Sequence, residues 1–364
     1  MAEPAVIIGA GPAGLAAAQV LRRRGLRFRL LERGDRPGHS WSRLYDSLTL
    51  HTGKHLSALP GMRFPRSTPL FPSRDDFLDY LESYVRTFDL DVETGTPVTT
   101  VERDGVWLVH TPNETIATQT LIVATGIIPG PFVPDIPGRA GFEGRLMHSI
   151  GYLRPAPFVG RRVLVVGVGN SGGEIGAELA RAGVDTTIAV RSGANVVPRT
   201  IAGVPIQYLS VYVRKLPRGA QERIVAAIGH ISEKRRGPPV LPRPPYSPLD
   251  AIPLIGFNLA DEIRAGRVAV RPGLERFTRT GVLFTDGTEA DFDDVILATG
   301  FRPALGPIAH LVRTDERGFA LRTDRIRSAD HDDLYFIGHN YDSSGGLQNI
   351  VRDARLLSPS LTAA

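Results

Sequence analysis

Two segments of the chain share one pattern of hydrophobic and polar positions. Each begins with a short apolar run, passes through a glycine-rich turn and continues into a longer stretch dominated by alanine and leucine. The first segment is "PAVIIGAGPAGLAAAQVLRRRG" from residue 4, and the second is "RRVLVVGVGNSGGEIGAELARAG" from residue 161. A short apolar run bounded by glycine indicates a buried strand, and the longer stretch indicates a helix. We therefore expect two strand–turn–helix units of an α/β fold with parallel strands.

The first turn has the spacing Gly9-x-Gly11-x-x-Gly14. The first glycine permits a tight turn, the second lets the backbone approach a pyrophosphate, and the third lets helix and strand pack closely. Free N–H groups at the helix start then face the phosphate charge. The next apolar run, "FRLLER", ends at Glu32, whose carboxylate suits a ribose diol. An ordinary strand–turn–helix is the alternative. The residues expected at this dinucleotide are Gly9, Gly11, Pro12, Ala13, Gly14, Glu32 and Arg33.

The second turn repeats the spacing as Gly167-x-Gly169-x-x-Gly172. Here the following run, "TTIAVRS", ends at Arg191 and Ser192 without an acid. A guanidinium and a hydroxyl suit a 2′-phosphate, so this pattern predicts NADP rather than NAD. The alternative for Arg191 is a solvated strand end. The residues expected at this nucleotide are Gly167, Gly169, Asn170, Ser171, Gly172, Arg191 and Ser192.

Three further apolar runs end at a glycine. They are "TLIVATG" to Gly126, "DVILATG" to Gly300, and "LYFIGHN", which turns at Gly338. A chain that returns in this way resembles the two-dinucleotide flavoproteins, so we expect two Rossmann-like domains. The resemblance implies a discontinuous FAD domain of residues 1–155 and 288–364 and an inserted NADP domain of residues 156–287. It adds Thr125, Gly126, Gly300 and Gly338 to the expected cofactor contacts.

The amino-acid composition excludes several classes of function. The 364 residues are 42 % hydrophobic and 22 % charged, as in ordinary soluble globular proteins. The absence of cysteine excludes disulfides, thiolate metal sites and a redox-active Cys-x-x-Cys pair, and no metal site is predicted. The net charge is +5, but its arginines are scattered along the chain, which disfavours nucleic-acid binding. A strand starts almost at the N-terminus and no apolar run reaches ~20 residues, so we expect a cytoplasmic protein without stable membrane insertion.

The insertion at residues 201–250 has two unusual parts. Its "GPPVLPRPPYSPLD" is too rich in proline for regular secondary structure and is expected to be a loop. The apolar "VPIQYLSVYVRKLP" before it is expected to be a buried helix that covers the active site. A helix lying on a membrane surface is the alternative.

The stretch "FEGRLMHSIGY", residues 142–152, lies between the two glycine loops. Phe142, Gly144, His148 and Tyr152 fill every position of Phe-x-Gly-x-x-x-His-x-x-x-(Tyr/Phe), the identifying stretch of the flavin-containing monooxygenases, which are class B flavoproteins. The chain resembles this family over nearly its whole length. The resemblance is to the YUCCA-like branch, through "SWSRLYDSLTLHTGKHLSALP", "VLVVGVGNSGGEI" and "GRVAVRPGLERF".

This resemblance implies bound FAD and NADPH. In the family, NADPH reduces FAD, and oxygen then adds to the flavin as a C4a-(hydro)peroxide while NADP⁺ stays bound. It further implies that Phe142–Tyr152 is an interdomain joint that seats NADP against the flavin, with His148 as a catalytic candidate. Trp41 and His51 would lie near the flavin. His51 stands where the amine-oxidising members carry asparagine, and we expect it either to set the protonation of the oxygen adduct or to hydrogen-bond the flavin.

The expected reaction inserts one oxygen atom into a small organic substrate, and His51 favours a 2-oxo acid of the indole-3-pyruvate kind. N- or S-oxygenation of a soft nucleophile is the first alternative. A flavin- or ferredoxin-type reductase and a non-catalytic nucleotide-sensing protein are the others, whereas a disulfide reductase lacks its cysteines. The expected partners are the substrate and O₂, and the sequence leaves a homodimer open.

Overall fold

The computed structural model describes residues 3–342 and 345–360, and the chain divides into two compact units. Unit 1 holds residues 1–130 and 301–364, and unit 2 holds residues 131–300. These boundaries lie away from the expected ones at 155/156 and 287/288. The reason is that strand β6 (Arg145–His148) pairs with β17 (Asp294–Leu297) inside the sheet of unit 2. Which nucleotide each unit binds stays a prediction at this point.

Unit 1 is built around a six-stranded sheet in the order β2-β1-β5-β4-β3, with β18 paired to β5. Strands β2, β1, β5 and β18 are parallel, whereas β3, β4 and β5 form an antiparallel meander. The strands are β1 (Glu3–Ile8), β2 (Arg29–Leu31), β3 (Thr100–Asp104), β4 (Val106–His110), β5 (Thr115–Val123) and β18 (Leu334–Phe336).

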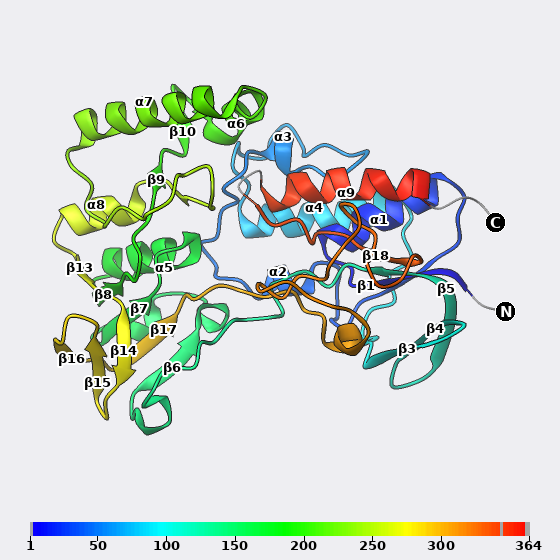
Figure 1. Cartoon of the computed structure of the whole chain (residues 1–364), viewed down its shortest axis with the longest axis horizontal. Coiled ribbons are helices and arrows are strands. Elements are labelled where there is room, and N and C mark those ends of the chain that lie inside the picture. The colour runs from blue at the N-terminus through cyan, green and yellow to red at the C-terminus, as the bar shows by residue number, and fades with distance from the viewer. Residues whose placement is uncertain (1–2, 343–344, 361–364) are drawn as a thin grey trace. The chain divides into compact units, whose positions relative to one another are not determined.

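Both faces of this sheet are buried, as the uninterrupted apolar run of β1 predicts. Ile7 packs into one core with helices α1, α4 and α9, whereas Val6 and Ile8 face a second core that contains Trp107. The N-terminal helix α1 and the C-terminal helix α9, blue and red in Figure 1, pack together. The helices are α1 (Pro12–Arg23), α2 (His39–Ser42), α3 (Lys54–Ser57), α4 (Arg74–Thr87), α9 (Gly346–Ser360) and the 3₁₀ helix η4 (Gly306–Leu311).

Unit 2 contains a five-stranded parallel sheet in the order β13-β8-β7-β17-β6. The antiparallel strands β14, β15 and β16 supply Phe277, Val282 and Phe284 to the core over one face, against Leu164 and Val295. Helix α5 packs on β7 and β8 and contacts α8. The elements are β7 (Arg162–Val166), α5 (Asn170–Arg181), β8 (Asp185–Ala189), α8 (Asn258–Arg264), β13 (Val268–Arg271), β14 (Leu274–Phe277), β15 (Gly281–Phe284), β16 (Glu289–Asp291) and the 3₁₀ turns η1 (Arg139–Gly141), η2 (Ser149–Gly151) and η3 (Ala156–Phe158).

The insertion of unit 2 contains two consecutive helices and several two-residue strands. Residues 237–253 form neither helix nor strand, as their prolines predict. The expectation of a buried apolar helix is wrong: the only buried residue of α6 is Gln207, and Tyr212 is 70 % exposed. Among the described residues, no helix is long and apolar enough to span a membrane. The elements are β9 (Val196–Val197), β10 (Thr200–Ile201), β11 (Val204–Pro205), α6 (Ile206–Val213), α7 (Arg218–Arg236) and β12 (Leu254–Ile255).

Candidate functional site

The first glycine loop joins β1 to α1, and its three glycines have different surroundings. Gly9 has φ +101°, and a Cβ there would lie 2.8 Å from the Ala124 carbonyl oxygen. A Cβ on Gly14 would lie 1.8 Å from the Gly9 carbonyl oxygen. Gly11, in contrast, has no described atom within 4 Å of such a Cβ. Gly9 and Gly14 are therefore required by the packing of the protein itself, whereas Gly11 leaves open space that a ligand can fill.

Helix α1 begins at this open space without a side chain that caps it. Gly11 is its N-cap residue, Pro12 follows at the first helical position, and no acidic residue lies in the first turn. The first N–H groups of a helix have no partner within the helix and lie at the positive end of its dipole. The start of α1 thus has the donors and the electrostatic sign that a pyrophosphate needs.

Glu32 follows β2 and is buried beside the same loop. Its Oε2 accepts a hydrogen bond from the Ala10 N–H at 2.8 Å, and its Oε1 accepts one from the Gly34 N–H at 2.8 Å. Each carboxylate oxygen has a second acceptor position. Glu32 is therefore held in place by the backbone and still has acceptor capacity for a ribose hydroxyl, while the adjacent Arg33 is exposed.

Thr125 lies directly after β5, next to the glycine loop. A Cβ on Gly9 would be 3.3 Å from the Thr125 Cα. The Thr125 Oγ1 is buried and has no hydrogen-bond partner among the described residues. Gly126 follows with φ +67°. A buried hydroxyl without a partner is unfavourable unless something bonds to it, so this edge of the sheet fits a polar ligand.

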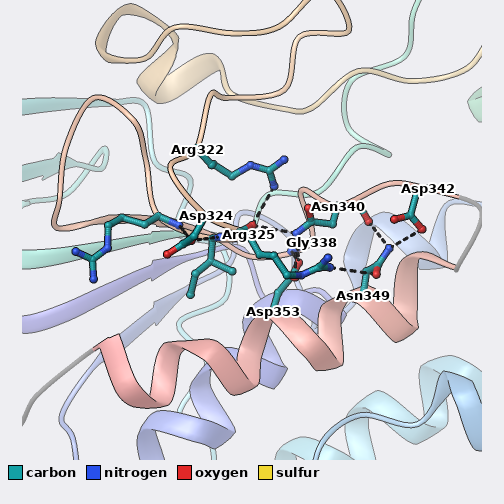
Figure 2. A network of polar contacts seen from close by, with 10 residues as sticks. Arg322, Asp324, Arg325, Gly338, Asn340, Asp342, Asn349 and Asp353 are labelled. Atoms are coloured by element: carbon teal, nitrogen blue, oxygen red, sulfur yellow. Dashed lines mark hydrogen bonds and ion pairs between the residues drawn. The ribbon is translucent and has the colours of Figure 1, made fainter. Parts of the chain in front are cut away.

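The last strand of unit 1 turns at Gly338, which has φ +80° and lies against the first turn of α1: a Cβ there would be 3.2 Å from the Ala13 Cβ. Figure 2 shows the network behind this turn. The fully buried Asp353 on α9 accepts from the Asn340 amide at 2.9 Å and from the Gly338 N–H at 3.4 Å, and it pairs with Arg325 at 3.0 Å. Burial raises the pKa of Asp353, while Asn340 and Arg325 oppose that shift. The network fixes the glycine turn beside the loop.

The structure adds a residue that the sequence reasoning missed. His339, directly after Gly338, is 2 % exposed and lies against the rings of Phe336 and Phe319. Neither of its ring nitrogens has a hydrogen-bond partner in the described part of the chain. Burial, with a smaller contribution from Arg322, lowers the pKa of His339 to about 3. The imidazole is therefore neutral, and only its position next to a glycine at a strand end could have drawn attention to it.

Trp41 and His51 belong to unit 1 but to different segments. Trp41 on α2 is half-buried and lies edge-on to Phe77 at 4.7 Å between ring centroids. His51 is half-buried, and the next residue, Thr52, contacts the segment that leads into α9: its Oγ1 lies 3.4 Å from a Cβ built on Gly345. Their proposed proximity to flavin stays a prediction.

The second glycine loop repeats the geometry of the first. Gly167 has φ +106°, with a built Cβ 2.6 Å from the Ala298 carbonyl oxygen, and a Cβ on Gly172 would lie 2.1 Å from the Gly167 carbonyl oxygen. Gly169 has no described atom within 4 Å and caps α5 without a side-chain hydrogen bond. Unit 2 therefore offers a second uncapped helix start with room for a phosphate.

The side chains around this second loop differ from those of unit 1. The Asn170 amide is engaged by the backbone: its Oδ1 accepts from the Ile255 N–H at 2.9 Å and its Nδ2 donates to the Pro253 carbonyl at 3.2 Å. Ser171 is half-buried in the first turn of α5. Arg191 and Ser192, just beyond β8, are exposed. The residue that directly follows β8 is buried Val190, so Arg191 lies one position further past its strand than Glu32 does in unit 1.

His148 ends β6 and is bonded on both sides of its ring. Its Nδ1 accepts from the Ile150 N–H at 3.2 Å, so its Nε2 carries the proton and donates to the Gly300 carbonyl at 2.9 Å. Gly300 has φ +90° and follows β17, the neighbour of β7. Burial lowers the pKa of His148, and the bond to Gly300 opposes that shift. The neutral imidazole therefore ties together two strand ends at the edge where the second glycine loop lies.

The other members of the Phe142–Tyr152 stretch stabilise unit 2 as well. The Phe142 ring lies 5.3 Å from the Phe277 ring. A Cβ on Gly144 would lie 2.3 Å from the Phe142 ring, which explains the glycine. Tyr152 is fully buried, and its hydroxyl donates to Glu178 of α5 at 2.8 Å. The stretch thus connects β6 to the helix that starts at the second loop.

Known proteins that resemble this chain match the part that contains both glycine loops. The family described as pyridine nucleotide-disulphide oxidoreductase matches residues 6–216. The indole-3-pyruvate monooxygenase YUCCA1 of Oryza sativa subsp. japonica is 37 % identical over 310 residues, which cover 82 % of this chain and 76 % of that protein. The indole-3-pyruvate monooxygenase YUCCA6 of Arabidopsis thaliana is 34 % identical, covering 82 % and 75 %. The chain belongs to the flavin monooxygenases. This confirms the resemblance and makes the protein a flavin-dependent oxidoreductase whose family uses FAD and NADPH.

Solved structures confirm the two-dinucleotide fold. The flavin-containing monooxygenase from Stenotrophomonas maltophilia is 27 % identical with a TM-score of 0.78, over 99 % of this chain and 98 % of that one. Cyclohexanone monooxygenase, at 20 % identity and a TM-score of 0.72 over 98 % and 86 %, shares the fold. So does the bacillithiol disulfide reductase from Bacillus cereus, at 20 % and 0.72. The fold alone therefore does not choose between oxygenase and reductase chemistry.

Proposed function

We propose that the protein is an NADPH- and O₂-dependent flavin monooxygenase that converts a 2-oxo acid to the carboxylic acid with one carbon less, with release of CO₂. The balanced reaction consumes one O₂, one NADPH and one proton, and yields CO₂, NADP⁺ and water. The printed names of the most similar relatives, indole-3-pyruvate monooxygenases at 34 to 37 % identity, support this substrate class. When bound, the flavin supplies the two-electron activation of O₂ that amino-acid side chains cannot perform.

The observation that carries the proposal is the pair of uncapped helix starts, each with an open glycine. In unit 1 we assign FAD to the loop of Gly9, Gly11 and Gly14, because buried Glu32 offers carboxylate acceptors to a ribose and the Thr125 hydroxyl lacks a partner in the described residues. Pro12 and Ala13 begin helix α1 directly after this loop, and Gly126 follows strand β5, so we assign all three to the same site. Trp41 and His51 are proposed near the flavin from the family resemblance.

In unit 2 we assign NADPH to the loop of Gly167, Gly169 and Gly172. Exposed Arg191 and Ser192 are proposed to bind the 2′-phosphate, because a guanidinium forms charge-assisted bonds to phosphate oxygens. His148 is proposed as a positioning residue rather than a proton donor, since its only N–H is engaged by the Gly300 carbonyl. It holds the strand end beside the loop on which NADP⁺ must remain.

One experiment separates this reaction from its alternatives. The flavin-loaded protein is given NADPH, oxygen and carboxyl-labelled indole-3-pyruvate, and NADPH, O₂, CO₂ and hydrogen peroxide are measured together. We expect about one CO₂ for each NADPH and little peroxide, with trimethylamine a poor substrate. Oxygenation of trimethylamine or a thioether without CO₂ release would instead assign N- or S-oxygenation. Flavin reduction without oxygenation of any of these would assign a reductase, and no reduction by NADPH would assign a non-catalytic nucleotide-binding protein.

The positioning role of His148 has its own test. His148→Ala should raise the fraction of NADPH that ends as hydrogen peroxide, because the Gly300 strand end loses its hydrogen bond. His148→Asn, whose amide N–H can donate to the same carbonyl, should restore part of the coupling. Equal peroxide yields in all three proteins would remove the role.

A further inference from the structure

Residues 201–250 carry the whole net charge of the protein. Eight of the 43 lysines and arginines and three of the 38 acidic residues lie in this range, so its net charge is +5. The rest of the chain holds 35 of each sign and is neutral. The cations are Arg214, Lys215, Arg218, Arg223, Lys234, Arg235, Arg236 and Arg243. The excess positive charge is therefore a local feature and not a property of the scattered arginines.

The acids of this segment are all engaged by two arginines. Arg218 pairs with Glu222 at 2.8 Å and with Asp250 at 2.7 Å, and Arg243 pairs with Glu233. In the part of the chain that the structure describes, Arg223, Lys234 and Arg235 have no ion-pair partner. Unpaired cations on one surface attract an anionic partner.

These three cations are exposed side chains of α7, whereas Ile224 and Ile228 of the same helix are half-buried. Residues 223 and 234 are eleven positions apart, which is close to three helical turns. Ile231, which is 52 % exposed, lies three and four positions before Lys234 and Arg235 and therefore neighbours both on the helix surface.

Helix α6 adds apolar side chains to this basic face. Six of its eight residues are apolar and none of these is buried, whereas its polar Gln207 is. Tyr212 is 70 % exposed and Leu216, just after the helix, is 42 % exposed. The Gln221 amide of α7 donates to the Leu216 carbonyl at 2.8 Å, so the two helices meet at this point, as Figure 1 also shows. We call Tyr212, Leu216, Arg223, Ile231, Lys234 and Arg235 the α6–α7 surface.

We propose that the α6–α7 surface binds the face of an anionic lipid bilayer, without spanning it. Cations next to exposed tyrosine, leucine and isoleucine match the two layers of such a face: lipid phosphates outside and acyl chains beneath. A second copy of the chain would bring the same positive charge and be repelled. A nucleic acid offers phosphates but no acyl layer for Leu216 and Ile231 to enter.

The test is co-sedimentation of the flavin-loaded full chain with vesicles. Vesicles of phosphatidylglycerol and phosphatidylcholine are compared with pure phosphatidylcholine, at low salt and at about 0.5 M salt, where screening is strong. We expect binding to the anionic vesicles at low salt, weakened by salt, and none to the neutral ones. Equal binding to both kinds of vesicle, or to neither, would overturn the proposal. Tighter binding to duplex DNA than to anionic vesicles would overturn it as well.

Two variants and a control connect the result to the surface. Arg223→Gln/Lys234→Gln/Arg235→Gln should weaken vesicle affinity roughly a hundredfold, at about fivefold for each cation near an anionic surface. Leu216→Ser/Ile231→Ser should weaken it and leave the salt dependence intact. The control, Arg27→Gln/Arg63→Gln/Arg66→Gln, removes three exposed arginines of unit 1 and should leave affinity within about twofold. Flavin content should be unchanged in all variants, and an equal loss in the control would show that only total charge matters.

Discussion

The two glycine loops have nearly the same backbone conformation, but the side chains that follow the neighbouring strands differ in charge and burial. In both, the first glycine has φ near +100° and donates its N–H to the end of the adjacent strand, Leu31 in unit 1 and Ala189 in unit 2. The residues after that strand differ. Glu32 directly follows Leu31 and is buried and held by two backbone N–H groups, whereas buried Val190 follows Ala189 and exposed Arg191 comes next. Both loops therefore have the geometry that suits a pyrophosphate, and we expect the choice of nucleotide to depend on the side chains that follow the neighbouring strand.

The largest effect should come from the glycines that pack against backbone. Gly14→Ala and Gly172→Ala each bring a Cβ within about 2 Å of a carbonyl oxygen, so each should lower the free energy of unfolding by about 3 kcal/mol, measured in urea. Gly11→Ala and Gly169→Ala are the matched controls, because their Cβ meets nothing in the described protein. They should stay folded and lose FAD and NADPH affinity, respectively. Equal stability of Gly14→Ala and Gly11→Ala would contradict the packing argument.

Glu32→Gln tests the buried side of the comparison. The amide NH₂ would face either the Ala10 or the Gly34 N–H, so one buried donor loses its acceptor. We expect a loss of about 2 kcal/mol in stability and weaker FAD binding, by denaturation and by flavin titration. Unchanged FAD affinity would separate Glu32 from the ribose.

Arg191→Gln tests the exposed side. Because the side chain is exposed, stability should not change. Losing a charge-assisted contact to the 2′-phosphate should raise KM for NADPH about tenfold to a hundredfold while KM for NADH stays constant. The measurement is the rate of flavin reduction with each coenzyme, and a parallel change for both would assign Arg191 no part in the preference.

Acid should destabilise the protein through a buried histidine of each unit. The pKa of His339 falls to about 3 in the folded protein, against an ordinary value near 6.5. Between these two pKa values the unfolded chain binds a proton that the folded chain does not. The free energy of unfolding therefore decreases as the pH is lowered, by up to about 1.4 kcal/mol per pH unit. His148 in unit 2 has a shift of the same direction. The raised pKa of Asp353 makes stability change with pH in the opposite direction. The contribution of His339 must therefore be measured against a variant that lacks this histidine.

His339→Phe supplies that variant, since its surroundings are already aromatic. It should flatten the fall in stability below about pH 6.5, measured by urea denaturation at several pH values, and leave the contributions of His148 and Asp353 in place. An unchanged slope would show that His339 is not the group that titrates.

The sequence predicted the parts that are local along the chain. Gly9 to Gly14, Gly167 to Gly172 and Glu32 follow from short spacing, and the fold and family from the order of such motifs. The Asp353 network was not predicted, because Arg325, Gly338 and Asp353 meet only after folding. The engagement of Asn170 by the backbone near Ile255 depends on the path of a distant loop. The prediction for helix α6 was wrong because its apolar residues suggested full burial, whereas each of them is only half-buried or exposed.

The Gly338 turn also has a consequence for synthesis of the protein. Strand β18 and helix α9, which emerge late from the ribosome, complete the sheet and helix layer around β1 and α1, which emerge first. Unit 2 needs only a continuous stretch and can form earlier. The nascent chain can therefore complete unit 2 while α1 still lacks its contacts with α9 and β5 lacks β18, so the first glycine loop is fully packed only near the end of translation.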